Sequence, residues 1–401
     1  MKNLIVGQSG GPSVAINATL AGVISAAQKS EKIGKVYGAK NGIEGILNDT
    51  VIDLTDFSDF EKLKVTPAMA LGSCRYKLPQ DISDPAYEKI DAFIKKYNIG
   101  FIAYIGGNDS MDTVSKLSRY YEGKEDAPFV IGLPKTIDND LTETDHTPGY
   151  GSAAKYLAVT MNELIRDVSI YNLKSVTIIE IMGRDAGWLT LAGGLPKFMG
   201  GEKPDIVAIP EVAFDEKKFI ETVRERMKVT NNIVVAVSEG IRDKNGDYVG
   251  SSTKSGAVDI FGHAYLSGVG KYLERLVKNE IGCKVRSIEL NLMQRCSSHL
   301  ASLCDIEESF EVGEYGVKAR LSGETGKMVA IKRISDKPYK SDFCTIFIDN
   351  AANKDKPVPE KWYDLEDKTV QKEICDYILP LIKGEPKKFE NEFGLYDYVI
   401  F

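Results

Sequence analysis

Histidine is scarce in this sequence, with three residues in 401. A nucleophilic triad built on histidine has few candidates, so a carboxylate is the more economical general base, and we expect no catalytic role for His146, His263 or His299. We expect His299 to pack within a helix. The six cysteines include no CxxC pair and no histidine spacing typical of zinc. Scattered thiols of this kind are typical of a protein that stays reduced in the cytosol.

Long apolar runs are also missing. None approaches the ~18 residues of a membrane span, and the N-terminus becomes glycine-rich too early for a signal peptide. Basic charge is in deficit, with a net charge of -7, which argues against broad binding of nucleic acid or of an anionic membrane. The 43% hydrophobic and 27% charged residues are ordinary for a globular protein. We therefore expect a cytoplasmic protein with two domains or one very large core.

The most informative stretch is PKTIDND, residues 134–140, which follows an apolar run at residues 129–133. The run predicts a buried strand, so the polar residues lie at its carboxyl end, where open α/β sheets bind ligands. One carboxylate can take the proton of a substrate alcohol while a second helps to place a cation. The alternative is a polar turn whose acids cap a helix. Alternation along an extended chain predicts two faces, Thr136, Asp138 and Asp140 on one, and Lys135, Ile137 and Asn139 on the other.

Units of strand, polar loop and helix recur along the chain. Apolar strands at residues 2–6, 101–105 and 129–133 each run into a loop rich in glycine or polar residues. Three such units aimed at one edge are the pattern of a doubly wound, Rossmann-like α/β sheet. A second set of strands predicts a second, similar domain, at residues 174–181, 206–209, 233–237 and 283–290. The final sixty or so residues are rich in charge and tyrosine, and we expect them to pack on the outside.

Seven motifs in this chain resemble those of the phosphofructokinase family, in the family's order. They are residues 9–11, 72–75, 106–110, 134–140, 182–184, 238–240 and 286–295. The resemblance implies two α/β domains with the active site in the cleft between them, and transfer of a phosphoryl group to the 1-hydroxyl of fructose 6-phosphate. It implies a donor-binding domain of residues 1–148 plus about 287–345. Residues from about 149 to 286, plus 346–401, then form the sugar-phosphate domain.

By this resemblance, Asp138 accepts the proton of the sugar 1-hydroxyl. Asp140 supports Asp138 and helps to hold the magnesium-bound phosphate, and Thr136 contacts the transferred group. The residues expected on the donor side are Gly11, Arg75, Gly107 and Ser110. Those expected to bind the sugar phosphate are Thr136, Ile137, Asp138, Met182, Gly183, Arg184 and Glu239, with Arg286 and Arg295 on its 6-phosphate.

The expected phosphoryl donor follows from two positions, Asp109 and Lys135, at which ATP-using relatives carry glycine. Asp109 places a carboxylate where the α-phosphate of a nucleotide would lie, and repels it through sterics and like charge. Lys135 can supply positive charge to the departing phosphate. The pair resembles the pyrophosphate-dependent branch, with Mg²⁺ as cofactor and a reversible reaction. Two alternatives stay open, an ATP-dependent enzyme of the same family and a catalytically silent regulatory subunit.

Three positions depart from the family pattern. Asn108 stands where the family usually has an acid associated with magnesium, so either Asp109 takes over or the metal rests mainly on pyrophosphate oxygens. Ser175, next to Lys174, stands where many members have an arginine that reaches the neighbouring subunit. We expect a homo-oligomer, dimer or tetramer, but this change puts the shared site in doubt. Leu292 replaces a common histidine, which suggests a 6-phosphate pocket rebuilt with Lys174 or Arg320.

Overall fold

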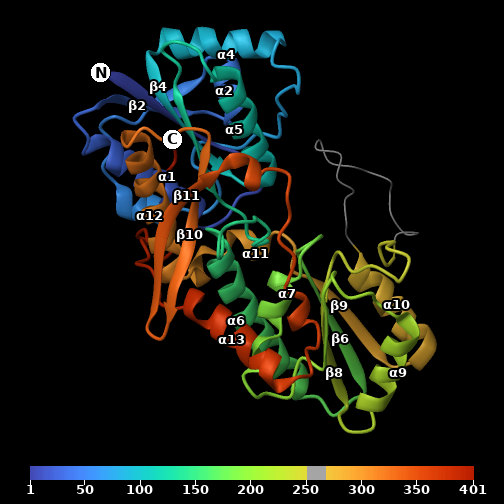
Figure 1. Cartoon of the computed structure of the whole chain (residues 1–401). Coiled ribbons are helices and arrows are strands. Elements are labelled where there is room, and N and C mark those ends of the chain that lie inside the picture. Colours follow the sequence, from blue (N-terminus) through green and yellow to red (C-terminus); the bar gives the residue numbers. More distant parts are fainter. Residues whose placement is uncertain (251–267) are drawn as a thin grey trace.

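The structure is a computed structural model that describes residues 1–250 and 268–401. Two β-sheets lie toward opposite ends of the molecule, and helices cover both faces of each sheet (Figure 1). The expected doubly wound α/β architecture is therefore confirmed. None of the helices in the described part of the chain combines the length and the apolar character that a membrane span needs.

The first sheet has seven strands in the order β11-β10-β5-β4-β1-β2-β3. They are β1 (Lys2–Gln8), β2 (Ile33–Ala39), β3 (Val51–Asp53), β4 (Ile99–Gly106), β5 (Phe129–Pro134), β10 (Lys327–Asp336) and β11 (Tyr339–Phe347). The central strands are parallel, while β3 and β11 pair antiparallel at the two edges. Because parallel strands are buried on both faces, β1, β4 and β5 appear in the sequence as continuous apolar runs.

One face of this sheet is covered by α1 (Ile16–Gln28) and α12 (Leu303–Leu321), which pack directly on each other. A Cβ on Gly22 would lie 2.0 Å from the carbonyl oxygen of Phe310, so only glycine allows the two backbones to approach this closely. The short helix α3 (Phe60–Lys64) packs beside α1. The other face carries α2 (Ile43–Leu47), α4 (Pro85–Lys96) and α5 (Asn108–Tyr121).

The second sheet has four parallel strands in the order β7-β8-β6-β9. They are β6 (Ser175–Ile181), β7 (Ile206–Ala208), β8 (Asn232–Ser238) and β9 (Lys284–Glu289), each within one residue of its predicted ends. One face packs against α6 (Tyr150–Ser169), α7 (Trp188–Gly193), α8 (Leu195–Phe198) and α13 (Lys368–Leu381). The other face packs against α9 (Glu216–Arg226) and α10 (Val269–Ile281).

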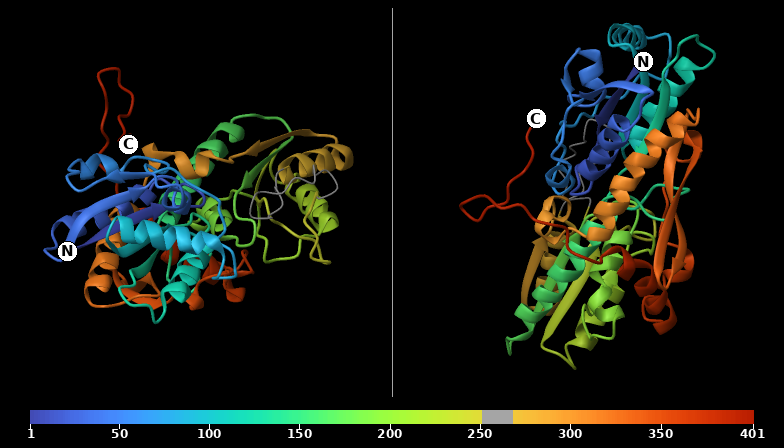
Figure 2. Two further views of the ribbon diagram at one scale, coloured as in Figure 1. Left: turned by 90° about the horizontal axis from the view of Figure 1, so that it is seen from above. Right: turned by 90° about the vertical axis from the view of Figure 1, so that its left-hand side faces the viewer.

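The C-terminal part of the chain is more deeply buried than we expected from the sequence. Ile374 and Ile378 of α13 are both 0% exposed in the second core, so the expectation that this segment packs on the outside is wrong for α13. The chain end then crosses back to the first core, where the rings of Phe57 and Phe401 lie 5.4 Å apart. Before that contact, the terminal segment projects from the body as a loop (Figure 2). The remaining short elements are α11 (Met293–Cys296), η2 (Ser298–Leu300), η3 (Ile348–Asn350) and η4 (Glu360–Trp362).

Candidate active site

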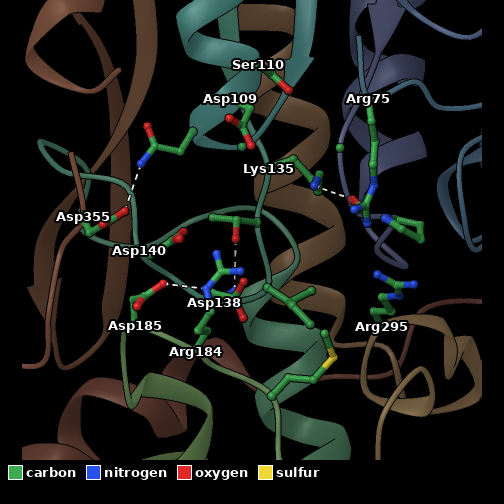
Figure 3. A pocket seen from close by; sticks show the side chains of 18 of the residues that line it. Arg75, Asp109, Ser110, Lys135, Asp138, Asp140, Arg184, Asp185, Arg295 and Asp355 are labelled. Atoms are coloured by element: carbon green, nitrogen blue, oxygen red, sulfur yellow. Dashed lines mark hydrogen bonds and ion pairs between the residues drawn. The ribbon is translucent and has the colours of Figure 1, made fainter. Parts of the chain in front are cut away.

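A cleft of about 720 Å³ collects the loops that follow strands of both sheets. It is lined by residues 10–12 after β1, 107–110 after β4, 135–138 and 140 after β5, 182, 184 and 185 after β6, and 239 after β8. Carboxyl ends of parallel strands meet at one edge of a sheet, and here the edges of two sheets face the same space. Side chains from elsewhere complete the lining, namely Arg75, Lys77, Tyr248, Arg295, Asn353 and Asp355. Figure 3 labels Arg75, Arg295 and Asp355 among them.

The loop after β5, residues 135–140, does not keep the alternation expected of an extended segment. Thr136, Asp138 and Asp140 do line the cleft, but so do Lys135 and Ile137. The chain turns at Asn139, whose φ is 55°, and the Asn139 side chain is buried on the other side, where it donates to Tyr377 Oη at 2.9 Å. The expected two-face arrangement is wrong because the backbone bends within the loop. The bend gathers the acids and Lys135 in one cleft.

The two carboxylates of this loop lie in an environment that disfavours their charge. Burial, together with the charge of Asp140, raises the pKa of Asp138 to about 7. Burial and the charge of Asp355 raise the pKa of Asp140. The buried Oδ1 atoms of Asp138 and Asp140 accept no hydrogen bond. Asp138 can therefore accept a proton at neutral pH, and both oxygens are open to a hydroxyl group or a cation.

The donor side of the cleft combines backbone amides with buried cations. Lys135 Nζ donates to the carbonyl oxygen of Gly11, and burial lowers the pKa of Lys135 to about 8. Arg75 and Arg295 both line this part of the cleft, and burial together with the charge of Arg75 lowers the pKa of Arg295. Opposite them, α5 begins at Asn108, with Gly107 before it. The site fits an anion, because free N–H groups and fixed positive charges converge there.

The loop before α5 places four predicted residues together. Gly107, Asn108, Asp109 and Ser110 all line the cleft, and Ser110 Oγ lies 2.5 Å from Ser9 Oγ. Asp109 is paired with Lys77, whose Nζ lies 3.2 Å from Asp109 Oδ1. Lys77 thus holds the Asp109 carboxylate at the donor side.

Asn108 is turned away from the role expected of it. Its Oδ1 accepts the backbone N–H of Asn353, and its Nδ2 donates to Asp355 Oδ1 at 3.0 Å and to the Lys354 carbonyl oxygen at 3.2 Å. The expectation that Asn108 helps to bind metal is not supported, because its oxygen already serves this neighbouring segment.

The sugar side is formed by the ends of β6 and β8. Glu239 Oε1 accepts the backbone N–H of Gly183 at 3.4 Å, and the backbone N–H of Met182 donates to Gln294. Burial and the charge of Asp138 raise the pKa of Glu239 to about 8. Arg184 Nε donates to Asp185 Oδ2 at 2.8 Å. Met182, Arg184 and Glu239 thus face the cleft together, with Gly183 providing the turn between the first two.

The cations expected around the 6-phosphate do not all reach this cleft. Arg295 lines it. Arg286 instead lies on the edge strand β9, beside Tyr171 and Lys284, in a separate shallow depression. Lys174 precedes the amino end of β6, and Arg320 lies over the ring of Phe129 at the amino end of β5. Because the cleft is at the carboxyl ends of these strands, the expectation that Lys174 or Arg320 rebuilds the pocket of their own chain is wrong.

None of the histidines that the structure describes lines the cleft. His146 is buried between Asp145 and Glu308, with ring nitrogens 2.8 and 2.7 Å from their carboxylate oxygens. His299 is exposed on η2, so the expectation that it packs within a helix is wrong. His263 lies outside the described residues.

Lys356, in the C-terminal part of the chain, holds the loop after β5 in place through hydrogen bonds. The backbone N–H of Lys356 donates to the carbonyl oxygen of Asp140 at 2.7 Å. Its Nζ donates to Asn139 Oδ1 at 3.2 Å and to the carbonyl oxygens of Thr144 and Asp145 at 3.1 and 2.8 Å. Burial lowers the pKa of Lys356 to about 8. One buried cation thus binds three points of the chain that follows β5, between Asn139 and Asp145.

Sequence reasoning missed five polar or charged side chains that line the cleft, namely Lys77, Asp185, Tyr248, Asn353 and Asp355. Asp185 follows Arg184 directly, so its position after a predicted strand was a usable signal. Asn353 and Asp355 carry no comparable signal, because only the path of the folded chain brings them to the loop after β5.

Comparison with known proteins gives full-length matches. The family model described as Phosphofructokinase matches residues 3–305. A pyrophosphate--fructose 6-phosphate 1-phosphotransferase of Xanthomonas campestris is 40% identical, over 99% of this chain and 95% of the relative. One from Halomonas elongata is 38% identical over 97% and 94%. The crystal structure of a pyrophosphate-dependent phosphofructokinase from Nitrosospira multiformis superposes with a TM-score of 0.86 at 35% identity, over 99% and 96% of the two chains.

Proposed function

The chain belongs to the phosphofructokinase family, and from this premise we propose that it transfers a phosphoryl group from pyrophosphate to the 1-hydroxyl of fructose 6-phosphate. The products are fructose 1,6-bisphosphate and phosphate, and the reaction is reversible. The observation that carries the choice of donor is that Lys135 and Asp109 line one cleft with the base Asp138. By the resemblance to the family, ATP-using members carry glycine at both positions.

Asp138 is the base in this proposal. It takes the proton of the 1-hydroxyl, whose oxygen forms a bond to the terminal phosphorus of pyrophosphate. The bond between that phosphorus and the bridging oxygen breaks, and phosphate leaves with the electron pair. A carboxylate with a pKa near 7 suits this step, because a base works best when its pKa lies near the working pH.

The cations of the donor side neutralise the charge that develops on the phosphate oxygens. Lys135 is fixed at the Gly11 carbonyl, so its ammonium group is already in place before the reaction. Phosphoryl transfer depends mainly on positioning and on charge neutralisation. A cleft lined by several cations meets that need.

In the proposed function, Asp109 is the residue that selects pyrophosphate over ATP as the phosphoryl donor. The Lys77–Asp109 pair keeps a carboxylate at the place of a nucleotide α-phosphate. Pyrophosphate has no third phosphate and no nucleoside, so it does not meet this group, whereas ATP is repelled.

A divalent cation, Mg²⁺, is part of the proposal and screens the charge of pyrophosphate when bound. The unpartnered buried Oδ1 of Asp140 suits such a cation. No group of three or more acidic, histidine or cysteine side chains suited to a metal is found among residues 1–250 and 268–401. The cation would therefore share its coordination between pyrophosphate and few protein ligands, as Mg²⁺ commonly does.

The sugar phosphate would bind to Met182, Arg184 and Glu239, with Arg295 on its 6-phosphate. Arg286 has no part in the cleft of its own chain. We propose that the enzyme is a cytoplasmic homo-oligomer, dimer or tetramer, and the exposed apolar side chains Ile170, Tyr171 and Leu173 near Arg286 support this. Light scattering of the purified chain tests it, and a monomeric mass would contradict it.

The activity is tested by initial rates with pyrophosphate, ATP and polyphosphate side by side, each with fructose 6-phosphate and Mg²⁺. We expect turnover with pyrophosphate and little with ATP. Turnover with ATP and none with pyrophosphate would indicate the ATP-dependent alternative. No turnover with any donor would indicate a silent subunit.

A further inference from the structure

Asp355 lies in the cleft beside Asp140, although the two residues are far apart in the sequence (Figure 3). The chain around Asp355 runs antiparallel to the end of the catalytic loop. Asp355 and Leu141 form an isolated bridge, and the backbone N–H of Lys356 donates to the carbonyl oxygen of Asp140. These backbone bonds set the position of Asp355 relative to Asp140, so the closeness of the two acids does not depend on side-chain flexibility.

Asn108 and Asp355 form a matched pair. Asn108 Nδ2 donates to Asp355 Oδ1 at 3.0 Å, and the backbone N–H of Asn353 donates back to Asn108 Oδ1. Asn353 Nδ2 in turn donates to Asp112 Oδ1 at 3.1 Å on α5. An acid at position 108 would repel Asp355, whereas the amide donates to it. Among the described residues no hydrogen bond engages Asp355 Oδ2, so the orienting bond to Oδ1 leaves the second oxygen available.

Asp140 and Asp355 form no salt bridge within the described part of the chain, although the charges of Lys135 and Lys356 act on Asp140. Asp140 Oδ1 is buried and accepts no hydrogen bond, and Lys77 is paired with Asp109. Two carboxylates at close range are unfavourable unless a cation joins them. An oxygen-only pair of this kind suits a hard divalent cation such as Mg²⁺, which is commonly held by one or two carboxylates together with substrate phosphates.

We propose that Asp355 and Asp140 together hold the divalent cation that accompanies pyrophosphate, and that Asn108 is the positioning residue of Asp355. The acid that the family carries at position 108 is thereby supplied from the C-terminal segment. This inference rests on the proposed function, because the phosphate oxygens of the donor complete the coordination. With only two carboxylates, the site holds the cation weakly until a diphosphate is present.

The test is the affinity for Mn²⁺ in the presence of saturating methylenediphosphonate, measured by electron paramagnetic resonance of free Mn²⁺. We expect Asp355→Asn to raise the Kd of Mn²⁺ by roughly 10- to 100-fold, the range found when a metal's supporting groups are removed. Binding of Mn²⁺ without the diphosphonate should be weak in both proteins. The melting temperature should stay close to that of the wild type, because Asp355 is exposed to the cleft.

Two further variants make the test specific. Glu360→Gln removes an exposed acid from the same segment, outside the cleft lining, and should leave the Mn²⁺ affinity unchanged. The exchange variant, Asn108→Asp with Asp355→Asn, restores one acid and one amide in reversed positions, and should recover much of the affinity lost by Asp355→Asn.

The inference is overturned if Asp355→Asn binds Mn²⁺ as tightly as the wild type in the ternary complex. It is equally overturned if Glu360→Gln loses as much affinity as Asp355→Asn. These outcomes are separate from a failure of the proposed function, which would appear as a wild-type protein without turnover on pyrophosphate.

Discussion

Asp138 is held where its own negative charge is disfavoured. Burial and the neighbouring Asp140 raise its pKa to about 7, far above the value of a solvated aspartate. The folded state therefore binds a proton at Asp138 more tightly than the unfolded chain does. Between about pH 4 and pH 7 the unfolded chain has lost this proton while the folded state still holds it, so the folded state loses stability relative to the unfolded state as the pH rises. A residue suited to take a proton from an alcohol thus costs the fold stability at neutral pH.

At this scale we predict opposite effects of Asp138→Asn on turnover and on stability. Turnover with pyrophosphate should fall by about two to four orders of magnitude, the usual contribution of a general base. The melting temperature at pH 8 should rise above that of the wild type, and the difference should shrink at pH 5, where Asp138 is protonated. Steady-state kinetics and thermal scans measure the two effects. Glu125→Gln, an exposed acid remote from the cleft, serves as control, and a lower melting temperature for Asp138→Asn at pH 8 would contradict the prediction.

The elements divide into those that the sequence predicts and those that it does not. The strands β1, β4 and β5 and the four strands of the second sheet were predicted, because most of them are apolar runs, whereas β3, β10 and β11 were not predicted. The predicted acids Asp138 and Asp140 lie at a strand end for the same local reason. The segment at residues 353–356 could not be placed in this way. It has no regular structure and residues 353–355 are exposed, and its position is set by contacts with α5 and with the loop after β5 that form only in the folded chain.

We predict that Lys356→Met lowers turnover more than it weakens substrate binding. The change leaves Asn139 Oδ1 and the carbonyl oxygen of Thr144 without a donor, and an unsatisfied acceptor typically costs about 1–3 kcal/mol when buried. The carbonyl oxygen of Asp145 keeps only the hydroxyl of Tyr377 as its donor. The loop that carries Asp138 and Asp140 should then be less well ordered. We expect kcat to fall at least tenfold while the KM for pyrophosphate changes less, and Lys356→Arg to recover part of the loss. Lys354→Met, at an exposed neighbour, is the matched control and should behave as the wild type.

The whole molecule is held together by segments that cross between its two cores. α12 packs against α1 in the first core, and Asp305 at its start accepts the backbone N–H groups of Gly149 and Ser152 at the beginning of α6. The chain end crosses in the other direction. The backbone N–H of Val399 donates to Thr66 Oγ1 at 3.1 Å, and Lys62 pairs with Asp397. The two sheets that face the cleft are thus connected at several points. These connections fix the position of the donor side of the cleft relative to the sugar side.

We predict that removal of residues 387–401 lowers stability and spares activity. The truncation removes the packing of Val399 and Phe401 on the first core, and partial burial of side chains of this size contributes about 1–3 kcal/mol. The melting temperature should fall by several degrees. None of the removed residues lines the cleft, so kcat and KM at 25 °C should stay within about twofold of the intact chain. Loss of turnover at a temperature where the truncated protein is still folded would contradict this.

The strand order of the first sheet has a consequence for how the protein is made. β5 lies between β4 and β10, yet β10 emerges from the ribosome almost two hundred residues after β5. During synthesis, the edge of β5 that later pairs with β10 therefore stays unpaired while the strands of the second sheet are translated. The unpaired N–H and C=O groups of an open strand edge can form hydrogen bonds with another nascent chain. Slow translation between β5 and β10 should accordingly favour aggregation, so the yield of active enzyme in a cell depends on elongation speed and on chaperones that shield that edge.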